Sequence, residues 1–322
     1  MIRIFKTNGI LQIAVIAAAL LAIYGGSLFD PPEMACDETC GPFYLLLHKI
    51  LSGVPHTAAV LALLLTLTEG YLLNRLLYDK SLIPLNSLMP TFLYVILMGI
   101  GVETNGLTPA LVTNLWLMLA LISMMPKDGM IMTENSIFNT TMWFSMAVMT
   151  WTPALFAAVP IIAGLLTYKV YKGREWSVAM LGFLALIIIV ATILFLIDRI
   201  DIAAKYAAGS TNGLRIYYDQ SPLPIAETVL FSLMAIFCTI STVSALFRTT
   251  IAQRKHGLVI VSLLIYSLSS LFYTKLTPLN VQPFAITVAT TGSIYLIGKK
   301  TKLWRYDIAL ALLFIMSLYS YL

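Results

Sequence analysis

Stretches of about 20 mainly apolar residues, the length that a helix needs to cross a bilayer, follow one another along the whole chain. Of its 322 residues, 59% are apolar and 11% are charged, and the mean hydropathy is +0.89. Soluble domains carry about 25% charged residues. The composition therefore excludes a soluble enzyme, a disordered protein and a secreted disulfide scaffold. It predicts an all-α, polytopic membrane protein whose residues 1-322 form a single integral membrane domain.

Polar and turn residues divide the apolar sequence into segments that predict about 11 transmembrane helices. The fifth, sixth and ninth segments are short. They are compatible with tilted helices or with a different pairing of these segments with their neighbours. The segments are Ile10–Phe29, Thr57–Leu77, about Ile83 to Val102, Thr108–Met125, Ile137–Trp151, Pro153–Tyr168, Ser177–Ile197, Ile225–Phe247, Leu258–Tyr273, about Val281 to Gly298, and Tyr306–Leu322.

The basic residues gather in alternate loops between these segments. With the N-terminus inside, fifteen of the 20 lysines and arginines fall in inner loops, and five fall in outer loops: Lys49, Arg199, Lys205, Arg215 and Lys275. Cytoplasmic loops carry such an excess in bacterial inner membranes. The pattern predicts an N-in/C-out protein of the inner (cytoplasmic) membrane. Because the cations lie in short loop clusters, the net charge of +5 does not indicate a nucleic-acid partner.

The first long outer loop, Asp30–His56, contains a predicted short helix. Gly41-Pro42 suits a helix start, because proline at the first helical position loses no needed donor. The segment is too short to span a membrane, so we expect it to lie flat in the outer interface. One helical face carries Phe43, Leu46, Leu47, Ile50 and Leu51, and the other carries His48, Lys49 and Ser52.

Carboxylates precede this helix at Asp30, Glu33, Asp37 and Glu38. Acids at the rim of a membrane protein can act as a general base or hold a divalent cation. Glu103, the acid of the second outer loop, would complete a metal site with Asp37 if the two loops meet. The alternative, equally open at this point, is that these are solvated acids of ordinary outer loops.

The outer cations are candidates for binding a lipid phosphate. Arginine binds phosphate through two parallel hydrogen bonds, and lysine binds it as a point charge. Arg215, which precedes Tyr217-Tyr218 in the loop Asp198–Pro224, is the favoured residue. Lys49 and Lys205 are the further candidates. A solvated loop is the alternative.

Two further features leave alternatives open. Cys36 and Cys40 lie on the predicted outer side, where an oxidising compartment would let a disulfide persist, but two thiols without a role fit as well. Glu69 lies near the middle of the second predicted span, and an ionisable residue there is a functional candidate by default. The alternative is a protonated glutamate bonded to a neighbouring helix, such as the one that carries Asn114.

Three short motifs resemble an uncharacterised family of polytopic inner-membrane proteins of this size from Bacteroidota. They are Thr113-Asn114-Leu115-Trp116, Ser136-Ile137-Phe138-Asn139 and Pro153-Ala154-Leu155-Phe156. That resemblance covers most of the chain and implies no activity.

A second resemblance is architectural. Asp37-Glu38 ahead of Gly41-Pro42-Phe43-Tyr44-Leu45-Leu46-Leu47, and a long loop after the seventh predicted span, are similar to the GT-C superfamily of membrane glycosyltransferases. In that superfamily the first outer loop carries a catalytic acid and then flat interfacial helices. Glu103 lies where some members carry a second acid. The similarity covers about residues 1-225, with additional C-terminal helices at about 226-322.

The GT-C resemblance implies a transferase that takes a sugar from a polyprenyl phosphate on the outer face of the membrane. Asp37 or Glu38 would be the general base, assisted by Asp30, and Arg215, Lys49 and Lys205 would bind the phosphate. Two other functions remain open. One is a transporter or lipid flippase that uses Glu69 as its coupling group, and the other is a non-catalytic subunit of a cell-envelope assembly with protein partners.

Overall fold

The computed structural model describes residues 5, 10–32, 34, 36, 40–83, 87–100, 106–126, 131–196, 198, 222–247, 249–271, 282–298, 307 and 310–314. The described part of the chain is helical and contains no strand, which confirms the all-α prediction. The backbones of Cys40 and Trp151 form an isolated antiparallel β-bridge. The helices are α1 (Ile10–Phe29), α2 (Pro42–Leu51), α3 (Pro55–Asp79), α4 (Met89–Met98), α5 (Pro109–Met124), α6 (Glu134–Thr150), the 3-10 helix η3 (Thr152–Ala157), α7 (Ala158–Thr167), α8 (Gly173–Leu196), α10 (Pro222–Leu246), α11 (Ile251–Ser270) and α12 (Gln282–Gly298).

The first ten predicted spans each coincide with helix in the structure, η3 and α7 together forming the sixth. The bounds of α1 are those predicted. Of the eleventh, Tyr306–Leu322, only residues 307 and 310–314 are described. Within the part of the chain that the structure describes, four helices are long and apolar enough to cross a membrane, namely α1, α3, α8 and the Thr228–Leu246 part of α10. The protein is therefore helical, with several helices that suit a membrane.

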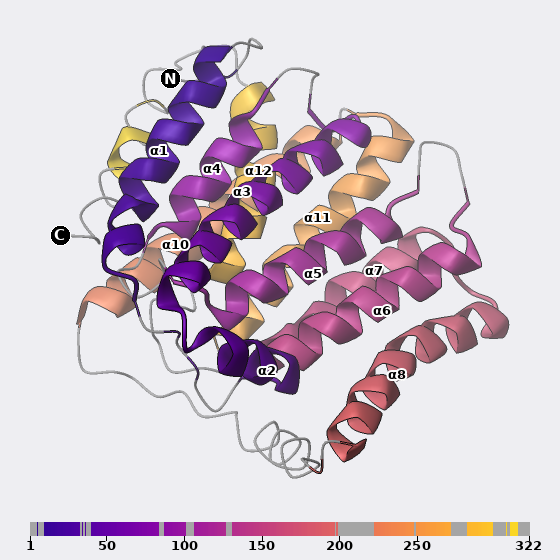
Figure 1. Ribbon diagram of the computed structural model, residues 1–322. Coiled ribbons are helices and arrows are strands. Elements are labelled where there is room, and N and C mark those ends of the chain that lie inside the picture. Colours follow the sequence, from indigo (N-terminus) through magenta and orange to yellow (C-terminus); the bar gives the residue numbers. More distant parts are fainter. Residues whose placement is uncertain are drawn as a thin grey trace.

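The third predicted span differs most from the expectation. Instead of a full crossing from about Ile83 to Val102, the chain forms the ten-residue α4, every residue of which is buried. Ten helical residues rise about 15 Å, half the thickness of a hydrocarbon core. The short helix is tolerated because all of its residues are buried and α3 and α12 pack against it. A helix that is apolar all round belongs in an interior, and α4 is enclosed by α1, α3 and α12 (Figure 1).

Successive helices run in opposite directions between two ends of the bundle. At one end, the "α2 end", the His56 ring bonds the Leu28 carbonyl and the Tyr44 hydroxyl donates to the Leu107 carbonyl. Figure 1 shows α2 at the lower edge of the bundle, crossing the foot of the longer helices.

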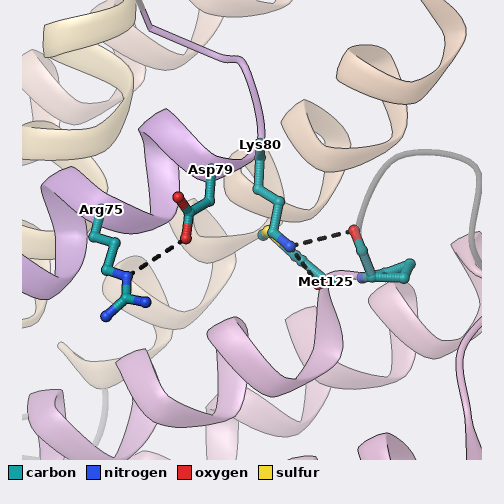
Figure 2. A network of polar contacts seen from close by, with 5 residues as sticks. Arg75, Asp79, Lys80 and Met125 are labelled. Atoms are coloured by element: carbon teal, nitrogen blue, oxygen red, sulfur yellow. Dashed lines mark hydrogen bonds and ion pairs between the residues drawn. The ribbon is translucent and has the colours of Figure 1, made fainter. Parts of the chain in front are cut away.

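The opposite end, the "basic end", is tied by contacts between Arg174 and Glu134, Gln253 and Ser81, and Tyr168 and His256. Lys80 also lies there, with its side chain only 6% exposed. Its ammonium donates to the carbonyls of Met125 and Pro126 beyond the end of α5, at 2.6 and 3.2 Å (Figure 2). A cation suits a helix C-terminus, where carbonyls lack intrahelical partners.

Candidate functional site

The structure describes two of the predicted site residues. Asp30, immediately after α1, and Lys49, near the end of α2, are both exposed. Asp37, Glu38, Glu103, Lys205 and Arg215 lie outside the described residues, so their predicted roles stay predictions. Described residues flank the two acidic loops, however: Pro32 and Cys40 lie on either side of Asp37 and Glu38 in sequence, and Ile100 and Gly106 lie on either side of Glu103.

The described ends of the two loops that were predicted to lie outside touch. A Cβ built on Gly106 lies 3.1 Å from Cγ of Pro32 and 3.8 Å from its Cβ. Pro32 directly precedes Glu33, and Gly106 follows Glu103 by three residues in sequence. The Tyr44 hydroxyl, from α2, donates to the carbonyl of Leu107 at 2.6 Å. The chain before and after the acids of the first loop, and the chain after Glu103, therefore lie together at the α2 end.

Gly41 fixes the start of α2 against the end of α6. Its N–H donates to the Thr150 carbonyl at 2.9 Å, and a Cβ on Gly41 would lie only 2.0 Å from the Met149 oxygen. No side chain fits there, which explains why glycine occupies this position. The expected helix start at Gly41-Pro42 is confirmed, with Gly41 as the N-cap and Pro42 in the first turn.

The faces of α2 differ in part from the expected pattern. Phe43, Leu47 and Leu51 pack against the core as predicted. Ile50, which was expected on the same face, is 76% exposed, whereas Tyr44 is fully buried. The buried face is therefore rotated toward Tyr44, because its hydroxyl finds a partner at Leu107 while its ring fills the core. The apolar side chain of Ile50 then points away from the protein.

An aromatic stack lies beside α2. The Trp116 and Trp143 rings are parallel, with centroids 5.5 Å apart, and Phe43 meets Trp116 edge-on at 5.9 Å. All three side chains are half-buried. The indole nitrogen of Trp116 is buried and has no hydrogen-bond partner. Trp143 belongs to α6, two turns before its end, and packs there against Trp116 of α5.

The cysteines of the first loop differ in environment. Cys36 is exposed and Cys40 is buried beside Trp151, and both are thiols in the structure rather than a disulfide. Among the described residues no group of three or more His, Cys, Asp or Glu is placed to hold a metal ion. The proposed cation ligands Asp37 and Glu103 lie outside that search.

Glu69 is completely buried on α3 and accepts a hydrogen bond from the Tyr94 hydroxyl of α4. Asn114 of α5 donates to the same hydroxyl at 3.2 Å. The alternative of a glutamate bonded to a neighbouring helix thus agrees with the structure, with Tyr94 standing between Glu69 and Asn114. The transporter alternative, in which Glu69 is the coupling group, stays a prediction.

Sequence reasoning did not identify Tyr94, Thr108 or Gln282 as parts of this network. The signal available was weak: a polar residue directly before a proline, in Thr108-Pro109 and Gln282-Pro283, which marks a helix start. The link between them is tertiary, since Thr108 Oγ1 donates to Gln282 Oε1 at 2.7 Å across 174 residues of sequence.

Comparison with known proteins adds no relative: neither family models, nor curated proteins, nor solved structures gave a match to this chain.

Proposed function

We propose that the protein is a membrane glycosyltransferase that moves a sugar from a polyprenyl-phosphate carrier to an acceptor at the α2 end. One observation carries this proposal: the contact between Pro32 and Gly106 gathers the first and second outer loops at one place. Asp37, Glu38 and Glu103 belong to these loops. The short α2, directly after the first acids, supports the likeness to the GT-C superfamily.

We further propose that the α2 end faces the outside of the bacterial inner membrane, with eleven spans and an N-in/C-out orientation. The described cations support this orientation. Only Lys49 belongs to the α2 end. Loops with an excess of Lys and Arg stay in the cytoplasm. The basic end would then be cytoplasmic, and its described cations are Arg75, Lys80, Lys169, Lys172, Arg174, Arg254 and Lys255.

In the proposed reaction, Asp37 or Glu38 removes the proton of an acceptor hydroxyl. The hydroxyl oxygen then forms a bond to the anomeric carbon of the sugar, and the bond from that carbon to the phosphate oxygen breaks. The electron pair leaves with the polyprenyl phosphate. Lys49, Lys205 and Arg215 would stabilise the charge on this leaving group, and Asp30 and Glu103 would assist or hold a divalent cation.

The half-buried aromatic stack of Phe43, Trp116 and Trp143 fits a lipid donor. It lies beside α2, where an isoprenoid chain would pass from the bilayer toward the acids. Flat aromatic faces offer large apolar contact area at low conformational cost. The stack is also available to ordinary lipid tails, so it supports membrane lipid as a partner more directly than it supports catalysis.

The test replaces both Asp37 and Glu38 with their amides in a strain that lacks the chromosomal copy. Surface and periplasmic glycans are compared by mass spectrometry, and expression is checked by immunoblot. Asp198→Asn, another acid at the start of an outer loop, is the matched control. We expect glycans to be lost in the double variant and kept in the control. Unchanged glycans with normal expression would contradict the proposal.

A further inference from the structure

The carboxyl of Glu69 lies inside the bundle without a cationic partner. The ion pairs of Arg75 with Asp79 and of Arg174 with Glu134 lie at the basic end, and among the described residues no cation is paired with Glu69. Burying an ionised carboxylate without a counter-charge is unfavourable by several kcal/mol, because the charge loses its hydration. The free-energy cost of placing a charged side chain inside a membrane is of the same order. Glu69 must therefore be neutralised, either by a proton or by a bound cation.

The groups around Glu69 form a chain of hydrogen bonds through four helices. The Tyr94 hydroxyl donates to Glu69 Oε2 and accepts from Asn114 Nδ2. The same amide nitrogen donates to the backbone carbonyl of Gln282 at 3.3 Å. The Gln282 side chain accepts from Thr108, the N-cap of α5. The chain thus leads from the bundle interior to the residue next to Leu107, at the α2 end.

Three buried atoms of this network have no hydrogen-bond partner. They are Oε1 of Glu69, Oδ1 of Asn114 and Nε2 of Gln282. The three side chains are at most 1% exposed. Buried polar atoms normally have partners, and a buried water commonly supplies them where several such atoms converge. Asn114 links Glu69, through Tyr94, to the backbone of Gln282, so the three incomplete groups of α3, α5 and α12 belong to one network, and a small polar partner would complete them.

The chemistry of these atoms decides between a metal cation and a proton. An alkali cation would satisfy the two oxygens but would leave the Gln282 amide unsatisfied and facing a positive charge. A proton on Glu69 Oε1 makes that oxygen a donor. One water can then accept from Glu69 and Gln282 and donate to Asn114, which completes all three groups.

We propose that Glu69, Asn114 and Gln282 form a proton-binding site inside the bundle, in which a single water bridges the three side chains and the Glu69 proton exchanges with solvent. Release breaks the O–H bond of Glu69, leaves its electron pair on Oε1 and passes the proton to the bridging water and on to solvent at the α2 end. The Tyr94 hydroxyl stabilises the resulting carboxylate.

The titratable groups in electrostatic contact with Glu69 among the described residues are Tyr94 and Tyr24. The site rests on this network alone and not on sugar transfer.

Infrared difference spectroscopy of the full-length protein in lipid nanodiscs tests this site. A protonated carboxyl has a C=O band well separated from those of carboxylates and amides. We expect such a band in the wild type, its loss in Glu69→Gln, and a reversible decrease as the pH rises. Asp79→Asn removes a half-exposed carboxyl from the end of the same helix and is expected to leave the band in place.

Tyr94→Phe provides a second variant that retains the carboxyl. Because it removes the hydrogen bond that stabilises the ionised form, we expect the band to persist to higher pH than in the wild type. A band that is absent at every pH would overturn the proposal, and so would a band that no pH change affects. Loss of the band on replacing choline with Na⁺ at constant pH would show an alkali-cation site instead.

Discussion

The hydroxyl of Tyr44 lies 2.6 Å from the carbonyl oxygen of Leu107, and this bond joins α2 to the start of α5. Tyr44 is fully buried, and the bond links the first predicted outer loop to the end of the second. Both loops carry predicted acids, so this bond and the nearby contact of Pro32 with Gly106 are the structural basis of the proposed site.

Removing the Tyr44 hydroxyl tests how strongly α2 is held. Tyr44→Phe keeps the ring but leaves the Leu107 carbonyl without this donor. We expect the free energy of unfolding to fall by about 1–3 kcal/mol, the cost of an unsatisfied buried polar group. Thermal unfolding in one detergent is the measurement, with Tyr71→Phe, on an exposed ring, as the control. Equal stability of the two variants would contradict the assigned bond.

The two glycines that flank α2 form a matched pair. A Cβ on Gly41 would collide with the Met149 carbonyl, whereas a Cβ on Gly53 meets nothing within 4 Å. We expect Gly41→Ala to lower the free energy of unfolding by about 1–3 kcal/mol through forced displacement of α2, and Gly53→Ala to change it by no more than about 0.5 kcal/mol. The same melting assay compares them, and an unaffected Gly41→Ala protein would refute the close approach.

Paired cysteines test whether the two acidic loops meet. The separation of 3.8 Å between Cβ of Pro32 and a Cβ on Gly106 equals the usual value for a disulfide. In a background without Cys36, Cys40 and Cys238, we expect Pro32→Cys with Gly106→Cys to form a bond under mild oxidation.

Mass spectrometry after proteolysis detects this bond. Pro32→Cys combined with Gly53→Cys is the control pair, and it should stay reduced. If the control pair forms a disulfide efficiently, or if the test pair forms none, the contact between the two loops is contradicted. The site then loses its main support.

Two neighbouring cations at the basic end should contribute very differently to stability (Figure 2). Lys80 is buried and donates hydrogen bonds to two carbonyls. Arg75 pairs with Asp79 at 3.6 Å, and the side chains of Arg75 and Asp79 are 63% and 49% exposed. We expect Lys80→Met to cost about 1–3 kcal/mol, because it removes a donor from buried carbonyls. Arg75→Ala should cost less than about 1 kcal/mol, as exposed ion pairs do. The reverse order in a denaturant titration would contradict this assignment.

The helical segments were predictable because apolar length and flanking polar residues are local signals. α1 has the expected bounds, and Gly41-Pro42 begins α2 as expected. Pro90 in the first turn of α4 and Gly99 directly after it are local signals for a ten-residue helix, and the prediction of a full span passed over them. The burial of all ten residues, by contrast, depends on the helices around α4. In the same way, the burial of Tyr44 in place of Ile50 depends on a carbonyl in another part of the chain.

The candidate site was less predictable than the fold. Composition and spacing singled out Asp30 and Lys49, which are exposed at the α2 end, and Glu69, which is buried. They did not identify Tyr94, Gln282 or Thr108, whose partners lie far away in sequence. Polar residues within apolar helices gain their roles from neighbours on other helices, and one sequence does not state which helices those are.

Sidedness labelling tests the central claim most directly, since the proposed chemistry requires the α2 end to face outward. In a cysteine-free background, Ser52→Cys reports on the end of α2 and Tyr171→Cys on the basic end; both positions are exposed. Spheroplasts are treated with a membrane-impermeant maleimide before and after permeabilisation. The account predicts labelling of Ser52→Cys in intact spheroplasts and of Tyr171→Cys only after permeabilisation. The opposite pattern would place the acids in the cytoplasm and contradict the account.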